Sequence, residues 1–229
     1  MIRKIRDEHW MSISDLMSGL MIVFMLIAIA YMVEVDHQQQ KQNEVIEEYA
    51  IVKHNIYVEL YNEFEGDLPK WNAELDEKTL AITFKEPDVL FATGSDVLNP
   101  QFKVILDDFL PRYIKVLSQE KYRDSVEEIR IEGHTDPNWK GANSRQEEYE
   151  KNMNLSQLRT QTVLKYAIEM PSLQKDLEWM IAHITANGLS SSHPIISSGV
   201  VDNERSRRVE FRVRTNADEK LNNLQEGLK

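Results

Sequence analysis

One apolar stretch, residues 12–33, constrains the fold of this chain more than any other feature. The run SISDLMSGLMIVFMLIAIAYMV contains a single charged residue, Asp15. From Leu16 to Val33 the run is free of charge, and 18 residues of α-helix span about 27 Å. Because the hydrocarbon core of a membrane is ~30 Å thick, we predict that residues 12–33 form a transmembrane helix.

A cleaved signal peptide is the alternative for such a stretch. Signal peptides have a shorter apolar core, followed by a cleavage site of small residues. Here no A-x-A site follows, and the chain continues into Glu34, Asp36 and a glutamine-rich stretch. Trp10 and Tyr31 would lie about 32 Å apart along the helix, which suits the two membrane interfaces. We therefore expect an uncleaved anchor.

The charges around the anchor predict its orientation and limit its partners. Three basic residues precede the run, whereas only Lys41 and Lys53 follow soon after it. Because cytoplasmic flanks carry an excess of Lys and Arg, we expect a cytoplasmic tail at residues 1–11 and an exported C-terminal part. Residues 1–33 carry three basic and three acidic side chains, so the net charge of −11 belongs to the later part. Such an acidic part argues against nucleic acid as a partner.

Asp15 has two interpretations. Residues 12–15 fit the S/T-x-x-D/E pattern of a helix start, which would make Asp15 a cap at the membrane surface. If the membrane begins near Trp10, Asp15 instead lies about 7 Å inside it, where a carboxylate is costly and marks a path for ions. The second interpretation predicts Asp15 as an ion carrier. Small neighbouring residues would let another helix approach it, namely Ser14, Ser18 and Gly19.

A polar, helix-favouring connector is expected at residues 34–77. Its apolar residues recur every three or four positions, as in an amphipathic helix: Val45, Tyr49, Val52, Ile56, Leu60 and Phe64. This helix would pack on its own domain or pair with a second copy as a short coiled coil. Gly66, Asp67 and Pro69 are expected to end it.

Residues 78–215 read as a compact α+β domain. Strands are expected at residues 80–84, 126–136, 181–186 and 207–215. Helices are expected from Pro100 and over residues 155–168, the second with Leu155, Leu158, Val163 and Leu164 facing inward. Strands separated by helices predict a mixed sheet with helices on one face. The tail at residues 216–229 is polar.

Five separated blocks carry a family resemblance. They are LFATGSDVL, IRIEGHTD, NMNLSQLRTQTVLKYA, ITANG…HP and NERSRRVEFRV. In order and spacing they resemble the OmpA-like peptidoglycan-binding domain, over roughly residues 78–215. The membrane stretch resembles the anchor of MotB, the ion-motor stator subunit, in which a tryptophan precedes an essential aspartate. Among MotB relatives, the short tail and compact connector resemble the stator-like subunit of Zorya anti-phage defence systems.

The resemblance implies a peptidoglycan-binding site. Asp136 would bind the ammonium group of diaminopimelate in the peptide stem, and Arg159 its carboxylate, which suits a zwitterionic head. Without the resemblance, Arg159 reads as a helix salt bridge and His134 as a packed loop residue. Residues 137–151 are longer than the family's loop, which leaves open a lid, a partner contact or a blocked site. The remaining implied binding residues are Thr135, Asn152, Leu155, Ser156 and Arg208.

The function implied by the resemblance is that of a stator subunit in the bacterial inner membrane. It would act as a homodimer inside a ring of a MotA-like multi-span subunit, pass ions (most simply protons) by way of Asp15, and hold to peptidoglycan. A flagellar motility stator and a passive wall tether without ion conduction are the alternatives. Cysteine is absent, and we find no nucleophile-serine or zinc-binding motif, so we expect no enzyme activity, cofactor or metal.

Overall fold

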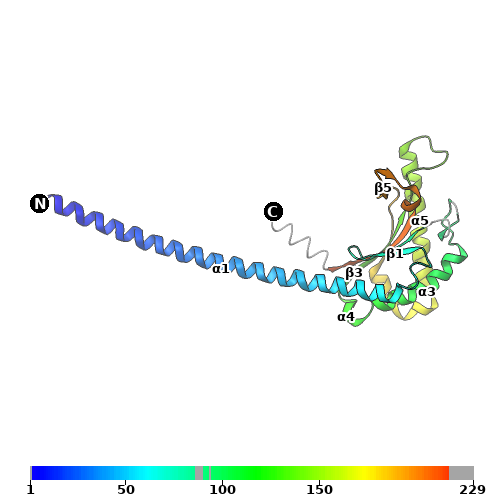
Figure 1. The fold of residues 1–229 in the computed structure, drawn as a ribbon, viewed down its shortest axis with the longest axis horizontal. Helices are drawn as coiled ribbons and strands as arrows, with labels where there is room; N and C mark the ends of the chain where they lie inside the picture. The colour runs from blue at the N-terminus through cyan, green and yellow to red at the C-terminus, as the bar shows by residue number, and fades with distance from the viewer. Residues whose placement is uncertain (1, 86–89, 93, 217–229) are drawn as a thin grey trace. The chain divides into compact units, whose positions relative to one another are not determined.

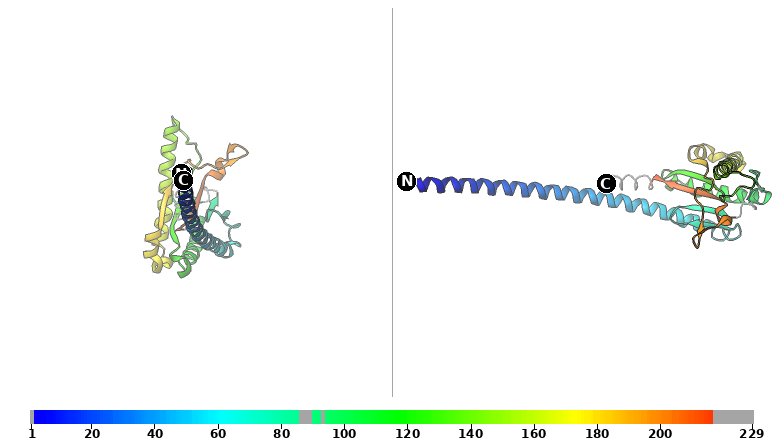
Figure 2. Two further views of the ribbon diagram at one scale, coloured as in Figure 1. Left: turned by 90° about the vertical axis from the view of Figure 1, so that its left-hand side faces the viewer. Right: turned by 90° about the horizontal axis from the view of Figure 1, so that it is seen from above.

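The computed structural model describes residues 2–85, 90–92 and 94–216 (Figure 1). The chain divides into two compact units, Met1–Glu48 and Tyr49–Lys229. Helix α1 (Ile2–Phe64) contributes residues to both units (Figures 1 and 2). Its sequence contains no proline and only one glycine, Gly19, so nothing interrupts the backbone hydrogen bonds between the predicted anchor and the predicted connector.

In the first unit, the segment Ser14–Lys41 is long and apolar enough to cross a membrane, with a mean hydropathy of 2.5. Every side chain in this segment is exposed, including its many leucine, isoleucine and methionine residues. An exposed apolar surface of this length has a physical explanation only if lipid or other helices surround it.

The second unit is built on a five-stranded sheet in the order β1-β2-β7-β3-β4. Its strands are β1 (Ala73–Asp76), β2 (Ala81–Lys85), β7 (Arg208–Thr215), β3 (Val126–His134) and β4 (Ile184–Gly188). The β3–β4 pair is parallel and the other pairs are antiparallel, so the sheet is mixed, as the sequence predicts. The largest differences from the predicted boundaries concern β1 and β4. β1 lies within the predicted connector 34–77, because α1 ends at Phe64 and the chain then turns back. Residues 181–183 end a helix rather than begin a strand.

Helices and one hairpin complete this unit. The long helices are α3 (Pro100–Leu117) and α5 (Arg145–Glu169). The short ones are α4 (Glu120–Arg123), η1 (Pro171–Asp176), α6 (Leu177–His183) and α7 (Asn203–Ser206), and the hairpin pairs β5 (Ile196–Ser197) with β6 (Val200–Val201). α5 begins ten residues before the predicted Leu155, because the Ser144 side chain caps it by accepting a hydrogen bond from the backbone N–H of Glu147.

The core lies between one face of the sheet and the helices. Phe84 of β2, Phe109 of α3 and Phe211 of β7 pack with ring centroids 5.0–5.8 Å apart. Residues of α3, α5 and α6 join this same cluster, which confirms the prediction of helices on one face. Fully buried residues of α1 join it too, namely Ile56, Leu60 and Phe64. This end of α1 therefore packs on its own domain.

Two glycines let α5 approach the sheet closely. A Cβ on Gly133 of β3 would lie 2.8 Å from the carbonyl oxygen of Ser156, and one on Gly188 of β4 would lie 2.4 Å from the backbone nitrogen of Gln157. Leucine side chains do not fit such a contact. The predicted inward face of α5 is therefore wrong in part, since Val163 is buried but Leu158 is 44% exposed. The buried residues of α5 are Asn152, Ser156, Arg159, Thr160, Val163 and Ala167.

Candidate peptidoglycan-binding site and membrane segment

A cavity of about 480 Å³ lies where β3 ends and α5 passes it. Five of the predicted binding residues line it, namely Thr135, Asp136, Asn152, Leu155 and Arg159. The other lining residues are Gly94, Asn138, Trp139, Lys140 and Arg207. The carboxylate and the guanidinium that the family resemblance singles out therefore line the same cavity.

The Asp136 side chain is held in place at the wall of this cavity. Its Oδ1 accepts a hydrogen bond from the backbone N–H of Asn138 at 2.8 Å. Its Oδ2 pairs with Nη1 of Arg207 at 3.2 Å. These two contacts hold both carboxylate oxygens in place.

Arg159 projects from α5 and is 8% exposed. Its Nε donates a hydrogen bond to the carbonyl oxygen of Ser95 at 2.9 Å. Its guanidinium carbon lies 4.9 Å from the ring centroid of Phe91, which is cation–π distance. The guanidinium thus bridges α5 and the segment that precedes α3, and these contacts fix its position against the cavity.

The Thr135 hydroxyl is buried in this wall with no hydrogen-bond partner among the described residues. The backbone N–H of Thr135 donates to the carbonyl oxygen of Ser190 at 2.9 Å, which fixes the residue where β3 ends. Leaving a buried polar group unpaired costs roughly 1–3 kcal/mol. A polar ligand in the cavity would supply the partner that Thr135 lacks.

Two predicted binding residues lie outside this cavity. Ser156 accepts a hydrogen bond from the backbone N–H of Ser190 and donates to the carbonyl oxygen of Met153, so it ties α5 to the segment after β4. Arg208 lies on the other face of the sheet, where its Nε donates to Glu210 at 2.6 Å. The arginine that contacts Asp136 is Arg207, the residue before Arg208, which the family resemblance does not single out.

Residues 137–151 form one wall of the cavity and the start of α5. Asn138, Trp139 and Lys140 line the cavity, whereas residues from Arg145 onward are helical. Glu147 closes the turn between them, since it accepts a hydrogen bond from the backbone N–H of Asn143 at 2.8 Å. A hydrogen bond from Lys151 and this backbone contact lower the pKa of Glu147 to about 2. The longer loop therefore extends the helix and borders the cavity without filling it.

In the membrane segment, Asp15 lies well inside α1. The helix begins at Ile2, so residues 12–15 come about three turns after its start, where no backbone N–H group is left to cap. The helix-cap interpretation is therefore wrong. Ser18 donates a hydrogen bond to the carbonyl oxygen of Ser14 at 2.9 Å. Apart from the adjacent backbone of the same helix, no atom of the described residues lies within 4 Å of a Cβ built on Gly19. This leaves a narrow, exposed helix surface next to Asp15.

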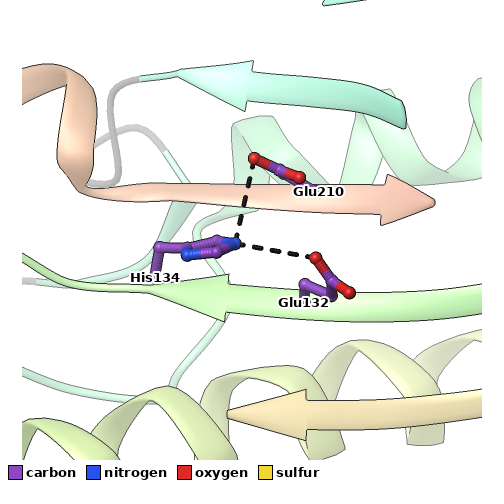
Figure 3. A group of neighbouring side chains, drawn as sticks. All are labelled: Glu132, His134 and Glu210. Atoms are coloured by element: carbon purple, nitrogen blue, oxygen red, sulfur yellow. Dashed lines mark ion pairs between the residues drawn. The ribbon is translucent and has the colours of Figure 1, made fainter. Parts of the chain in front are cut away.

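A second buried cluster, formed by Glu132, His134 and Glu210, lies on the sheet face that turns away from the core (Figure 3). Nε2 of His134 lies 3.8 Å from a carboxylate oxygen of each glutamate. Burial lowers the pKa of His134, so its ring is neutral near pH 7. The three residues could reach one metal ion, but arginines already occupy the same carboxylates. Arg208 binds Glu210, and Arg212 binds both glutamates at 2.7–3.2 Å.

Comparison with known proteins decides the family. No protein-family model matches the chain. It is 47% identical over 217 residues to the Zorya protein ZorB of Escherichia coli, a match that covers 93% of this chain and 90% of the relative. The chain belongs to the ZorB family. The predicted resemblance to Zorya stator-like subunits is thereby confirmed.

The fold of this ZorB-family member is similar to that of a solved MotB-like protein. A putative MotB-like protein from Desulfovibrio vulgaris is 28% identical, with a TM-score of 0.50, and the match covers 76% of this chain and 94% of that one. The cell wall anchor of the type VI secretion system from Pseudomonas aeruginosa also matches, at 22% identity and a TM-score of 0.47, over 69% of this chain and 97% of that one. The predicted fold class, an apolar helix followed by an α+β domain, is confirmed.

Proposed function

We propose that this ZorB-family protein is a stator-like subunit of an inner-membrane, ion-driven complex, that it is anchored to peptidoglycan, and that it serves anti-phage defence. The family match supports the defence role, because the relative is named as a Zorya protein. The observation that carries the anchoring role is the cavity that Asp136 and Arg159 both line, together with the Thr135 hydroxyl, which has no hydrogen-bond partner among the described residues.

This cavity suits an amino-acid head group that carries both charges. An ammonium group would bind the carboxylate of Asp136, and a carboxylate on the same carbon would bind the guanidinium of Arg159. The side chain of diaminopimelate in the peptide stem ends in such a group. Arg207 holds the Asp136 carboxylate in place, while Asn152 and Thr135 add polar groups that would fix the head's orientation. The ammonium and the carboxylate of the ligand must bind together, so a ligand that carries only one of these charges should not be sufficient for binding.

The membrane segment would conduct ions together with a partner. Asp15 would take a proton on the exported side and release it inward, and its neutral and charged forms would interact differently with a surrounding ring of a ZorA-like, multi-span subunit. The narrow surface at Ser14, Ser18 and Gly19 would let a second copy or a ring helix approach. The N-terminus would be cytoplasmic and the second unit periplasmic, where it would hold a homodimer still against the wall.

The Asp136→Asn variant tests the anchoring role. Asparagine keeps the size of the side chain but removes its charge, so the binding of full-length protein to purified peptidoglycan should fall about tenfold or more. The measurement is co-sedimentation of the protein, in detergent, with peptidoglycan that contains diaminopimelate.

The matched control is Asp124→Asn, which removes an exposed carboxylate at the end of α4. This variant should bind peptidoglycan like the unmodified protein. Equal binding by Asp136→Asn and Asp124→Asn would show that the cavity is not the wall-binding site.

A further inference from the structure

A second cavity, of about 730 Å³, lies on the sheet face that turns away from the core. Its lining contains six cationic side chains and one carboxylate, although the chain as a whole has a net charge of −11. The cationic residues are Lys53, Lys78, Arg130, Arg208, Arg212 and Arg214, and the carboxylate is Glu132. Positive charge is thus concentrated at one place on an acidic protein.

The alternation of side chains along a strand explains why these cationic residues lie on the same face of the sheet. Alternate residues of a strand point to the same face, so the arginines of β7 share one face while Val209, Phe211 and Val213 enter the core on the other. β3 contributes its own polar residues to the same face, and the register places Arg130 opposite Arg212 and His134 opposite Arg208. Both strands therefore bring donors to one cavity.

The glutamates of this face hold the arginines without using all of their donors. Arg130 and Arg214 pair with Glu128 at 2.7 and 3.3 Å, and Arg212 pairs with Glu132 and Glu210. Each guanidinium carries five N–H donors in a planar fork, so donors remain beyond the bonds to these carboxylates. The two lysines bring further positive charge to the cavity.

Three buried nitrogen atoms in this wall lack hydrogen-bond partners among the described residues. His134 is 4% exposed, and neither of its ring nitrogens has a hydrogen-bond partner there. Nε of Arg212 is also buried without a hydrogen-bond partner among these residues. Its contact with Glu132 is an ion pair that lacks hydrogen-bond geometry. A divalent cation would have to displace arginines from Glu132 and Glu210 and would add positive charge to a cationic site. An anion would neither displace these arginines nor add positive charge to the cavity.

We infer that this cavity binds a phosphoryl group, as a phosphate monoester or as the phosphodiester of a larger molecule. A monoester carries up to two negative charges near pH 7 and presents three oxygen acceptors, which matches a wall of several guanidinium and ammonium groups better than a single carboxylate does. The cavity shares no lining residue with the peptidoglycan cavity, so the inference is independent of the proposed wall binding.

The test uses the full-length protein in detergent, titrated with sodium phosphate at constant ionic strength and pH. Binding is followed by ³¹P NMR line broadening and by the thermal unfolding midpoint. We expect saturable binding that is about tenfold weaker in the double variant Lys53→Gln/Lys78→Gln, because long-range attraction by the two lysines is lost. The matched control, Lys103→Gln/Lys115→Gln, removes two exposed lysines of α3 and should bind phosphate like the unmodified protein.

A second arm distinguishes free phosphate from a lipid head group. Nanodiscs of phosphatidylglycerol are compared with nanodiscs of phosphatidylcholine, whose head group carries a compensating cation. The inference is supported if binding in either arm depends on Lys53 and Lys78. The arm in which this binding occurs shows whether the phosphoryl group comes from free phosphate or from a lipid head group. Equal behaviour of both double variants in both arms overturns it, as does a thermal shift that chloride reproduces. The Lys53→Gln/Lys78→Gln variant should still bind peptidoglycan, so a failure here is separate from a failure of the proposed function.

Discussion

Replacing Asp15 with asparagine is expected to abolish ion flux through the membrane complex and all activity that the flux drives. Asp15 is the only charged residue of the stretch 12–33, so no nearby group can take over a proton. Asparagine keeps the shape and polarity of the side chain but cannot bind and release a proton. The measurement is proton uptake into vesicles that contain the protein with the proposed ZorA-like partner.

The matched control for this experiment is Asp36→Asn, which removes a carboxylate of the same helix beyond the apolar run. This variant should conduct protons like the unmodified protein. Undiminished flux through Asp15→Asn would remove the ion-carrying role and leave a passive wall tether.

Replacing Gly188 with alanine is expected to lower the free energy of unfolding of the second unit by about 3 kcal/mol or more. The added Cβ would lie 2.4 Å from the backbone nitrogen of Gln157 and 2.7 Å from its Cα. Backbone atoms cannot move aside as a flexible side chain can, so α5 must shift away from β4 and disturb the packing of the helix. Denaturant unfolding of the full-length protein, followed by tryptophan fluorescence, measures the effect.

Gly66→Ala provides the matched control, because no atom lies within 4 Å of a Cβ at that position. Its effect should stay within about 0.5 kcal/mol. If Gly188→Ala were as stable as Gly66→Ala, the close approach of α5 to the sheet would be wrong.

Hydrophobic and charge patterns in the sequence are sufficient to predict most of the sheet. β7 alternates charged and apolar residues over its whole length, and this pattern identifies both its faces. β1 was missed because its four residues carry little pattern and are defined by pairing with β2. The inward face of α5 was mispredicted because contact with Gly133 and Gly188 favours small and polar residues over leucines. That contact is tertiary and has no signal within α5.

Family resemblance, rather than local pattern, located most of the candidate site. Asp136 and Arg159 are 23 positions apart, and only the fold brings them to one cavity. The choice between Arg207 and Arg208 depends on where β7 begins, since neighbouring residues point to opposite sides. The basic cavity could not be predicted from the sequence, because α1, β3, β7 and two loops each supply part of its lining.

Competition by small molecules tests the central claim, that the cavity of Asp136 and Arg159 holds the zwitterionic head of the peptide stem. Full-length protein is bound to peptidoglycan and challenged with diaminopimelate, with pimelate, which lacks the ammonium groups, or with cadaverine, which lacks the carboxylates. We predict that diaminopimelate releases the protein, whereas pimelate and cadaverine at the same concentration leave it bound. Release by all three alike, or by none, would contradict the account.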